Sequence, residues 1–176
     1  MADTLTREQR HIVMSHIRSK NTRPEMLVRR FLHHHGIRYS LHVRRMPGSP
    51  DLVLRRYRTA IYVNGCFWHG HSPCTIFRMP STNVEFWTTK IDRNRQRDAQ
   101  QHQLLLQAGW HVIVIWECQL RTAPQRQQTL NGLLRTLNQI ELQNLGVHHF
   151  GSYDLNQEDL YSARAAEDTQ DNESLT

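Results

Sequence analysis

The chain has little cysteine, almost no lysine and no long hydrophobic run. It contains 3 cysteines in 176 residues, an odd and small number that argues against a disulfide scaffold. No apolar run approaches the ~20 residues that a membrane-spanning helix needs, and the first residues are too polar for a signal peptide. We therefore expect a cytoplasmic protein without a membrane partner, and the length predicts one domain with a sizeable core.

Acidic residues are also scarce, except at the C-terminal end. Residues 158–176 hold six acids against Arg164 alone, whereas residues 1–157 carry 21 basic and 10 acidic residues, a net charge of +11. Of the 22 basic residues 20 are arginine, whose planar guanidinium suits phosphate oxygens and base edges. The basic body predicts a polyanionic partner, and we expect a single domain over residues 1–144 followed by an acidic, disordered tail over residues 145–176.

The segment 65–74, GCFWHGHSPC, gathers two cysteines, two histidines and two aromatic residues in one short loop. Cys66, His71 and Cys74 have C-x4-H-x2-C spacing, which suits three ligands of one zinc ion. The spacing alone leaves His69 open as the ligand in place of His71. Free, buried cysteines beside a solvated turn are the alternative to any metal site.

Cys118 is the remaining cysteine and directly follows the apolar run 111–116. If this run and the run 59–64 are neighbouring parallel strands, Cys118 and Cys66 leave the sheet at the same end and can share one metal. A zinc with four protein ligands would stabilise the fold and take no part in the reaction.

Capping and turn signals predict the element order α-α-β-β-β-α-β-α, an α/β protein. Thr22 and Glu25 form a capping box with Pro24 in the first turn, and Gly36 ends this helix. The expected helices are 6–19, 22–36, 85–108 and 124–144, and the expected strands are 39–45, 51–55, 59–64 and 111–116.

A carboxylate and a backbone carbonyl can face each other across one predicted hairpin. Asp51 follows Pro50 at the start of one strand, and Val63 lies at the end of the next. Such oxygen ligands form the hard site that Mg²⁺ prefers. The alternative is that Asp51 is only a turn residue.

Two further sets of residues are candidates for DNA binding. Phe67, Trp68 and Trp87 lie in loops or at a helix start, where no periodicity requires them, so they could stack on bases or wedge between them. Ordinary packing is the alternative. The predicted helix 85–108 also carries a polar stripe that either enters a DNA groove or stays solvated, formed by Lys90, Arg93, Asn94 and Arg97.

The chain contains the segments PGSPD (47–51), GCFWH (65–69), FWTTKIDRNRQRD (86–98) and GWHVIVIWEC (109–118). Together these segments resemble the very short patch repair (Vsr) endonucleases, in order and without large gaps between about residues 14 and 120. The resemblance implies a restriction-endonuclease-like, PD-(D/E)XK fold, a mixed sheet flanked by helices with a structural zinc. It also implies a magnesium-dependent nick on the 5′ side of the thymine in a T:G mismatch, the lesion left when 5-methylcytosine deaminates.

The same resemblance implies roles for single residues. Asp51 and the Val63 carbonyl match the magnesium site, His69 matches the general base, and Glu25 matches a glutamate near the active site. Met14 matches a residue that approaches the duplex from the groove opposite the aromatic residues. The implied zinc ligands are Cys66, His71, Cys74 and Cys118, and the implied aromatic wedge is Phe67, Trp68 and Trp87.

The chain departs from the family pattern at Asn64, where many relatives have histidine. Asparagine can donate to a phosphate but cannot transfer a proton, so a mechanism with two histidines is in doubt. The strand 59–64 also lacks the (D/E)-x-K sequence of many nucleases with this fold.

Three functions remain open from the sequence. The favoured one is a monomeric T:G nicking enzyme that acts on double-stranded DNA alongside other mismatch-repair proteins. The others are a nuclease of a restriction or mobile-element system with another target, and a zinc-stapled DNA-binding module without catalysis. The presence of both Asp51 and His69 favours an enzyme.

Overall fold

The computed structural model describes residues 8–9, 12 and 20–146 of the chain. Most of the helix expected over residues 6–19, including Met14, and the tail from residue 147 onward lie outside this part. No helix among the described residues has the length and apolarity needed to cross a lipid bilayer. The elements are α2 (Arg23–His34), β1 (Ser40–Leu41), β2 (Leu52–Leu54), β3 (Thr59–Asn64), α3 (Val84–Gln107), β4 (His111–Trp116), the 3-10 helix η1 (Glu117–Leu120) and α4 (Ala123–Asn144).

The four strands form one mixed sheet in the order β1-β2-β3-β4. β1 and β2 pair antiparallel, as do β2 and β3, whereas β3 and β4 pair in parallel from Thr59↔His111 to Asn64↔Trp116. The predicted α/β class and the predicted parallel pairing of these two runs are confirmed. Because the two strands end in register, the residues after Asn64 and Trp116 leave the sheet at the same edge.

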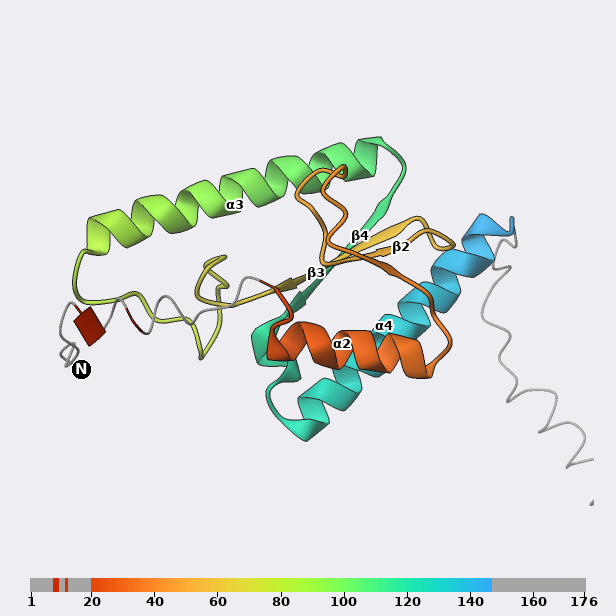
Figure 1. Ribbon diagram of the computed structural model, residues 1–176, viewed down its shortest axis with the longest axis horizontal. Helices are drawn as coiled ribbons and strands as arrows, with labels where there is room; N and C mark the ends of the chain where they lie inside the picture. Colours follow the sequence, from red (N-terminus) through yellow and green to blue (C-terminus); the bar gives the residue numbers. More distant parts are fainter. Residues whose placement is uncertain (1–7, 10–11, 13–19, 147–176) are drawn as a thin grey trace, which may run out of the picture.

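Helices cover both faces of this sheet (Figure 1). α2 and α4 pack on one face, and the C-terminal part of α3 packs on the other, where Leu105 contacts Ala60 and Tyr62. β3 is therefore covered on both sides, which explains its continuous apolar sequence. The larger core cluster includes Val28, Leu32, Leu52, Leu54, Ile61, Ile115, Leu133 and Leu137.

α3 is a long polar helix of 24 residues whose buried positions are Ile91 and Leu105. Its N-terminal half extends beyond the strands (Figure 1). This half stays close to the loop that follows β3, because the Asn94 side-chain amide donates to the Trp68 carbonyl at 2.8 Å. One end of α3 thus belongs to the core, and the other end borders the candidate site.

The strand expected over residues 39–45 was wrong in length, since β1 spans two residues. The reason is His42, whose φ of +44° turns the chain out of the sheet. The strand expected from residue 51 also begins one residue later, so Asp51 lies in the loop just before β2.

The cap of α2 also differs in part from the prediction. Thr22 Oγ1 accepts a hydrogen bond from the Glu25 N–H at 3.3 Å, as the capping box predicts. The Glu25 carboxylate, however, accepts from the backbone N–H of Asn21 at 2.7 Å rather than from that of Thr22. The reciprocal bond therefore closes one residue earlier than expected.

Candidate functional site

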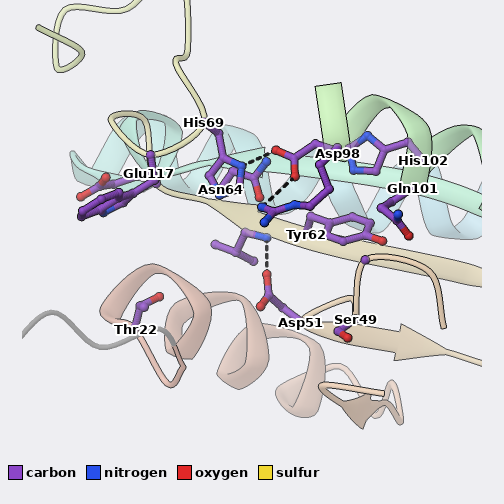
Figure 2. Close-up of a pocket in the computed structure, with 15 residues that line it drawn as sticks. Thr22, Ser49, Asp51, Tyr62, Asn64, His69, Asp98, Gln101, His102 and Glu117 are labelled. Carbon is purple, nitrogen blue, oxygen red and sulfur yellow. Dashed lines mark hydrogen bonds and ion pairs between the residues drawn. The ribbon is translucent and has the colours of Figure 1, made fainter. Parts of the chain in front are cut away.

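A cleft of about 600 Å³ opens where α2 and β2 begin and β3 ends, beside the middle of α3. Figure 2 shows Asp51 on one side of this cleft and His69 with Asp98 on the other. Segments far apart in the sequence therefore contribute to one concave site. Its charged and polar lining includes Asp51, Asn64, His69, Arg97, Asp98 and Glu117.

Asp51 is fixed against the end of β3. Its Oδ2 accepts a hydrogen bond from the Val63 N–H at 2.7 Å. Burial raises the pKa of the Asp51 carboxyl, the Val63 hydrogen bond opposes this rise, and the nearby charge of Glu25 adds to it. Because the N–H and C=O of one strand residue point to the same side, the Val63 carbonyl lies on the side of β3 where Asp51 accepts the Val63 N–H.

His69 forms a hydrogen-bonded pair with Asp98 of α3 through Nδ1 and Oδ2 (Figure 2). Burial alone would raise the pKa of Asp98, but the hydrogen bond and charge of His69 outweigh it, so this pKa is lowered. Asp98 therefore stays ionised beside the imidazole. Sequence reasoning gave Asp98 no role, because 29 residues separate it from His69 and no local spacing connects them.

Glu25 is 2% exposed. It connects to Asp51 through His42, whose Nε2 is 3.2 Å from Glu25 Oε1 and whose Nδ1 is 3.8 Å from Asp51 Oδ1. Sequence reasoning missed His42, which it assigned to a strand. Asn64 is buried at the end of β3 and lines the cleft between these two groups of residues.

A second cluster lies where the loops after β3 and β4 leave the sheet. The ligand atoms of Cys66, His71, Cys74 and Cys118 all fall within 4.8 Å of one another, so they could hold a metal ion. His71 Nδ1 is 3.6 Å from the Cys66 sulfur and 3.4 Å from the Cys118 sulfur. Usual tetrahedral bond lengths would place sulfur and nitrogen ~3.6 Å apart. His69 is not part of this group, since it pairs with Asp98.

The surroundings of the cluster favour a neutral His71 imidazole and oppose a free thiolate at Cys66. The His71 ring stacks on Trp116, with ring centroids 4.0 Å apart and planes 2° from parallel. Burial lowers the pKa of His71 and raises that of Cys66 to about 12. Cys66 would therefore become a thiolate only beside a cation, as metal binding provides.

Phe67, Trp68 and Trp87 form an aromatic cluster between the loop after β3 and the start of α3. Phe67 is 5.1 Å from both tryptophan rings, centroid to centroid, and the tryptophan rings are 6.1 Å apart. The Lys90 ammonium lies 5.6 Å from the Trp68 ring and 5.5 Å from the Trp87 ring. Sequence reasoning missed Phe86, which is 57% exposed and extends this cluster at 5.2 Å from Trp87.

The polar stripe of α3 is divided between two tasks. Asn94 is half-buried and holds the Trp68 carbonyl, so its amide is engaged within the protein. Lys90 and Arg93 are exposed, and Arg97 is exposed at the rim of the cleft, where it lies 3.5 Å from Asp98. The stripe thus presents cations on either side of an amide that supports the aromatic turn.

Known proteins match most of this chain. Residues 2–75 match the family model described as DNA mismatch endonuclease Vsr. The chain is 42% identical over 134 residues to the type II nicking enzyme V.XorIIP of Xanthomonas oryzae pv. oryzae, which covers 76% of this chain and 98% of that protein. It is 42% identical over 137 residues to the type II nicking enzyme V.NmeAIP of Neisseria meningitidis, and this match covers 78% of this chain and 97% of that protein. It is 37% identical over 121 residues to the DNA mismatch endonuclease Vsr of Escherichia coli, and this match covers 69% of this chain and 77% of that protein.

Proposed function

Because the chain belongs to the Vsr family of DNA endonucleases, we propose that it nicks one DNA strand on the 5′ side of the thymine in a T:G mismatch. This mismatch arises when 5-methylcytosine deaminates. The observation that carries the proposal is the cleft in which Asp51 faces the His69–Asp98 pair beside the aromatic cluster. The mixed sheet, with its acidic residue just before β2, supports a restriction-endonuclease-like, PD-(D/E)XK fold.

The proposed magnesium ligands are Asp51 and the Val63 carbonyl. Both are hard oxygen donors, and the Val63 backbone is turned toward Asp51, so the residues present fit this ion. When bound, Mg²⁺ supplies positive charge near the scissile phosphate and favours ionisation of a water molecule.

His69 is the proposed general base. Its Nδ1 is held by Asp98, which leaves Nε2 to accept the proton of the attacking water. The ionised Asp98 then stabilises the imidazolium that forms. Asn64 lines the same cleft and can donate to a phosphate oxygen, so we infer a mechanism with one proton-transferring histidine.

Zinc is the metal we propose for the Cys66, His71, Cys74 and Cys118 cluster. Three thiolates and one imidazole are a soft, four-ligand set of the kind that closes a tetrahedral structural site. The ion would join the turn after β3 to the end of β4. It would thereby fix both His69 and the aromatic residues within that turn.

The aromatic cluster is the proposed reader of the mismatch. A T:G wobble is poorly stacked, so insertion of Phe67, Trp68 and Trp87 costs less there than at a matched pair. Lys90, Asn94 and Arg97 on α3 are proposed DNA contacts, with Met14 approaching from the opposite groove.

We also propose that residues 1–144 form the DNA-cleaving domain, that the chain acts as a monomer, and that other mismatch-repair proteins act with it.

A second candidate follows from the names of the relatives. The Xanthomonas oryzae and Neisseria meningitidis proteins are called type II nicking enzymes. This chain would then serve a restriction system and prefer the sequence context of that system, with the same chemistry in the same cleft.

The decisive experiment compares duplexes of one sequence that carry T:G, C:G or T:A at one position, in several methylation-site contexts with magnesium. We expect a single nick 5′ of the mismatched thymine and no cleavage of the matched duplexes. T:G nicking confined to one sequence context would favour the restriction-linked candidate. Tight binding without cleavage in magnesium would indicate a DNA-binding module and would contradict the proposal.

A further inference from the structure

His42 lies between two carboxylates that come from different elements. Glu25 projects from the first turn of α2, and Asp51 precedes β2 at the cleft. The His42 ring is 16% exposed, with Nε2 3.2 Å from Glu25 Oε1 and Nδ1 3.8 Å from Asp51 Oδ1. Each nitrogen therefore lies within ion-pair distance of one carboxylate, and among the described residues the buried Nε2 has no hydrogen-bond partner.

Each carboxylate commits one oxygen to a backbone N–H and turns the other toward His42. Glu25 Oε2 accepts from the Asn21 N–H at 2.7 Å, and Asp51 Oδ2 accepts from the Val63 N–H at 2.7 Å. The Glu25 oxygen that faces His42 is also 3.4 Å from an Arg29 nitrogen. The second Asp51 oxygen lies 3.8 Å from His42 Nδ1, which is within ion-pair distance but longer than a hydrogen bond.

The backbone of His42 is tied to the same residue. Its N–H donates to the Asp51 carbonyl at 3.2 Å. Its φ is +44°, a backbone conformation that residues with a Cβ rarely adopt. Backbone in such sparsely populated regions persists where the surroundings determine it, and it is concentrated at functional sites. Both the main chain and the side chain of His42 thus bear on Asp51.

We propose that His42 is a positioning residue that links Glu25 to Asp51 and holds the Asp51 carboxylate in the orientation that binds the catalytic divalent cation. The inference rests on the proposed magnesium site at Asp51, and not on the identity of the mismatch. It also gives Glu25 a role beyond its helix cap, because Glu25 lies 3.2 Å from the His42 ring and would hold it in place. Groups that orient a metal ligand typically change metal affinity or activity by about 10–100-fold when removed.

The test uses the full chain without DNA and compares Mn²⁺ binding, followed by the electron paramagnetic resonance signal of free Mn²⁺, with Mg²⁺ as competitor. His42→Asn keeps a residue that tolerates a left-handed backbone, but its side chain is too short to lie between both carboxylates. We expect about tenfold weaker Mn²⁺ binding, with a melting temperature close to that of the wild type. The matched control is His34→Asn at the exposed end of α2, which should bind as the wild type does. Asp51→Asn should remove the site.

Nicking of a T:G duplex supplies the second measurement. His42→Asn should raise the Mg²⁺ concentration for half-maximal rate about tenfold, while saturating Mg²⁺ restores most of the rate. His42→Gln, which can reach one carboxylate, should recover part of the loss. Unchanged Mn²⁺ binding and unchanged Mg²⁺ dependence in His42→Asn would overturn the inference. If the wild type leaves T:G duplexes uncut but binds Mn²⁺ through His42 and Asp51, the inference holds and the proposed function fails.

Discussion

At the scale of single residues, we expect the ionised Asp51 carboxylate to support activity and to lower the stability of the fold. Burial raises its pKa, so the ionised form that the reaction needs destabilises the fold at neutral pH. Asp51→Asn should abolish nicking and yet raise the melting temperature in magnesium-free buffer, since asparagine can still accept from the Val63 N–H. Each kcal/mol released corresponds to ~2–4 °C for a chain of this size.

The sign of this effect depends on pH. A raised pKa means that the folded protein holds its proton more tightly than the unfolded chain does. The stability of the wild type therefore falls as pH rises from the unfolded pKa of about 3.9 through the higher folded value. The gain from Asp51→Asn should be largest at pH 7 and shrink as the pH approaches 4, in thermal melts taken across that range. If the melting temperature of Asp51→Asn rose equally at every pH, the gain would come from packing and not from the charge of Asp51.

Asp98 should act through His69 and not through DNA binding. Asp98→Asn removes the charge that fixes the imidazole and stabilises its protonated form, so the nicking rate should fall by about 10²–10⁴. Affinity for a T:G duplex should change little. The matched control is Asp92→Asn on the same helix, an exposed carboxylate that lies 4.0 Å from Arg95. A wild-type rate in Asp98→Asn under single-turnover conditions would contradict the role given to the pair.

Some residues of the site could be predicted from the sequence because their signals are local. The cysteine and histidine spacing, the Pro-Asp before a strand and the aromatic residues in a loop are all readable within ten residues. Asp98 and His42 could not be predicted, since their importance comes from contacts with His69 and Glu25 that only the folded chain creates. The choice between His69 and His71 was open for the same reason.

At the scale of elements, the parallel pairing of β3 and β4 makes the Cys–His cluster a tie between two strand ends. Cys118→Ser should release zinc and lower the melting temperature by about 10 °C or more, because structural zinc contributes several kcal/mol to folding. Elemental analysis of protein purified without chelator measures the metal. His69→Ala is the control and should keep zinc, because His69 lies outside the cluster. Well under one zinc per chain in the wild type would contradict the assignment.

The turn after β3 and the start of α3 form one recognition element. Trp68 is held by the Asn94 amide at its carbonyl and by the Lys90 cation near its ring. Base–aromatic stacking contributes about 1–3 kcal/mol per base, or roughly one to two orders of magnitude in affinity. Trp68→Ala should therefore weaken binding to T:G duplexes about 10- to 100-fold and binding to matched DNA far less. Equal losses in paired titrations at one salt concentration would show that the ring does not read the mismatch.

Most elements could be predicted from periodicity and caps, and the exceptions have local physical causes. β3 and β4 are largely apolar runs, and α2 is capped by Thr22 and has proline in its first turn. β1 ends early because His42 adopts a left-handed backbone conformation, which could not be predicted from the sequence. The turn signals in the sequence therefore overestimated the length of this strand.

At the scale of the whole molecule, charge is segregated along the chain. Residues 147–176 hold seven acids and one arginine, a net charge of −6, so residues 1–146 carry +12. The match to V.XorIIP covers 98% of that relative but 76% of this chain, so part of this chain has no counterpart there. An acidic segment on a basic nuclease should compete electrostatically with DNA phosphates.

A chain that stops after Gly146 tests this competition. We expect it to melt at the same temperature as the full chain, because the core clusters of the part that the structure describes lie within residues 28–140. Its affinity for matched DNA at low salt should rise several-fold with a steeper salt dependence, and the difference should vanish near 0.5 M salt, where charges are screened within ~4 Å. A full-length variant with the seven acids changed to Asn or Gln should bind as the truncated chain does, if charge and not chain length is responsible. Unchanged affinity in both variants would mean that the acidic segment acts independently of DNA binding.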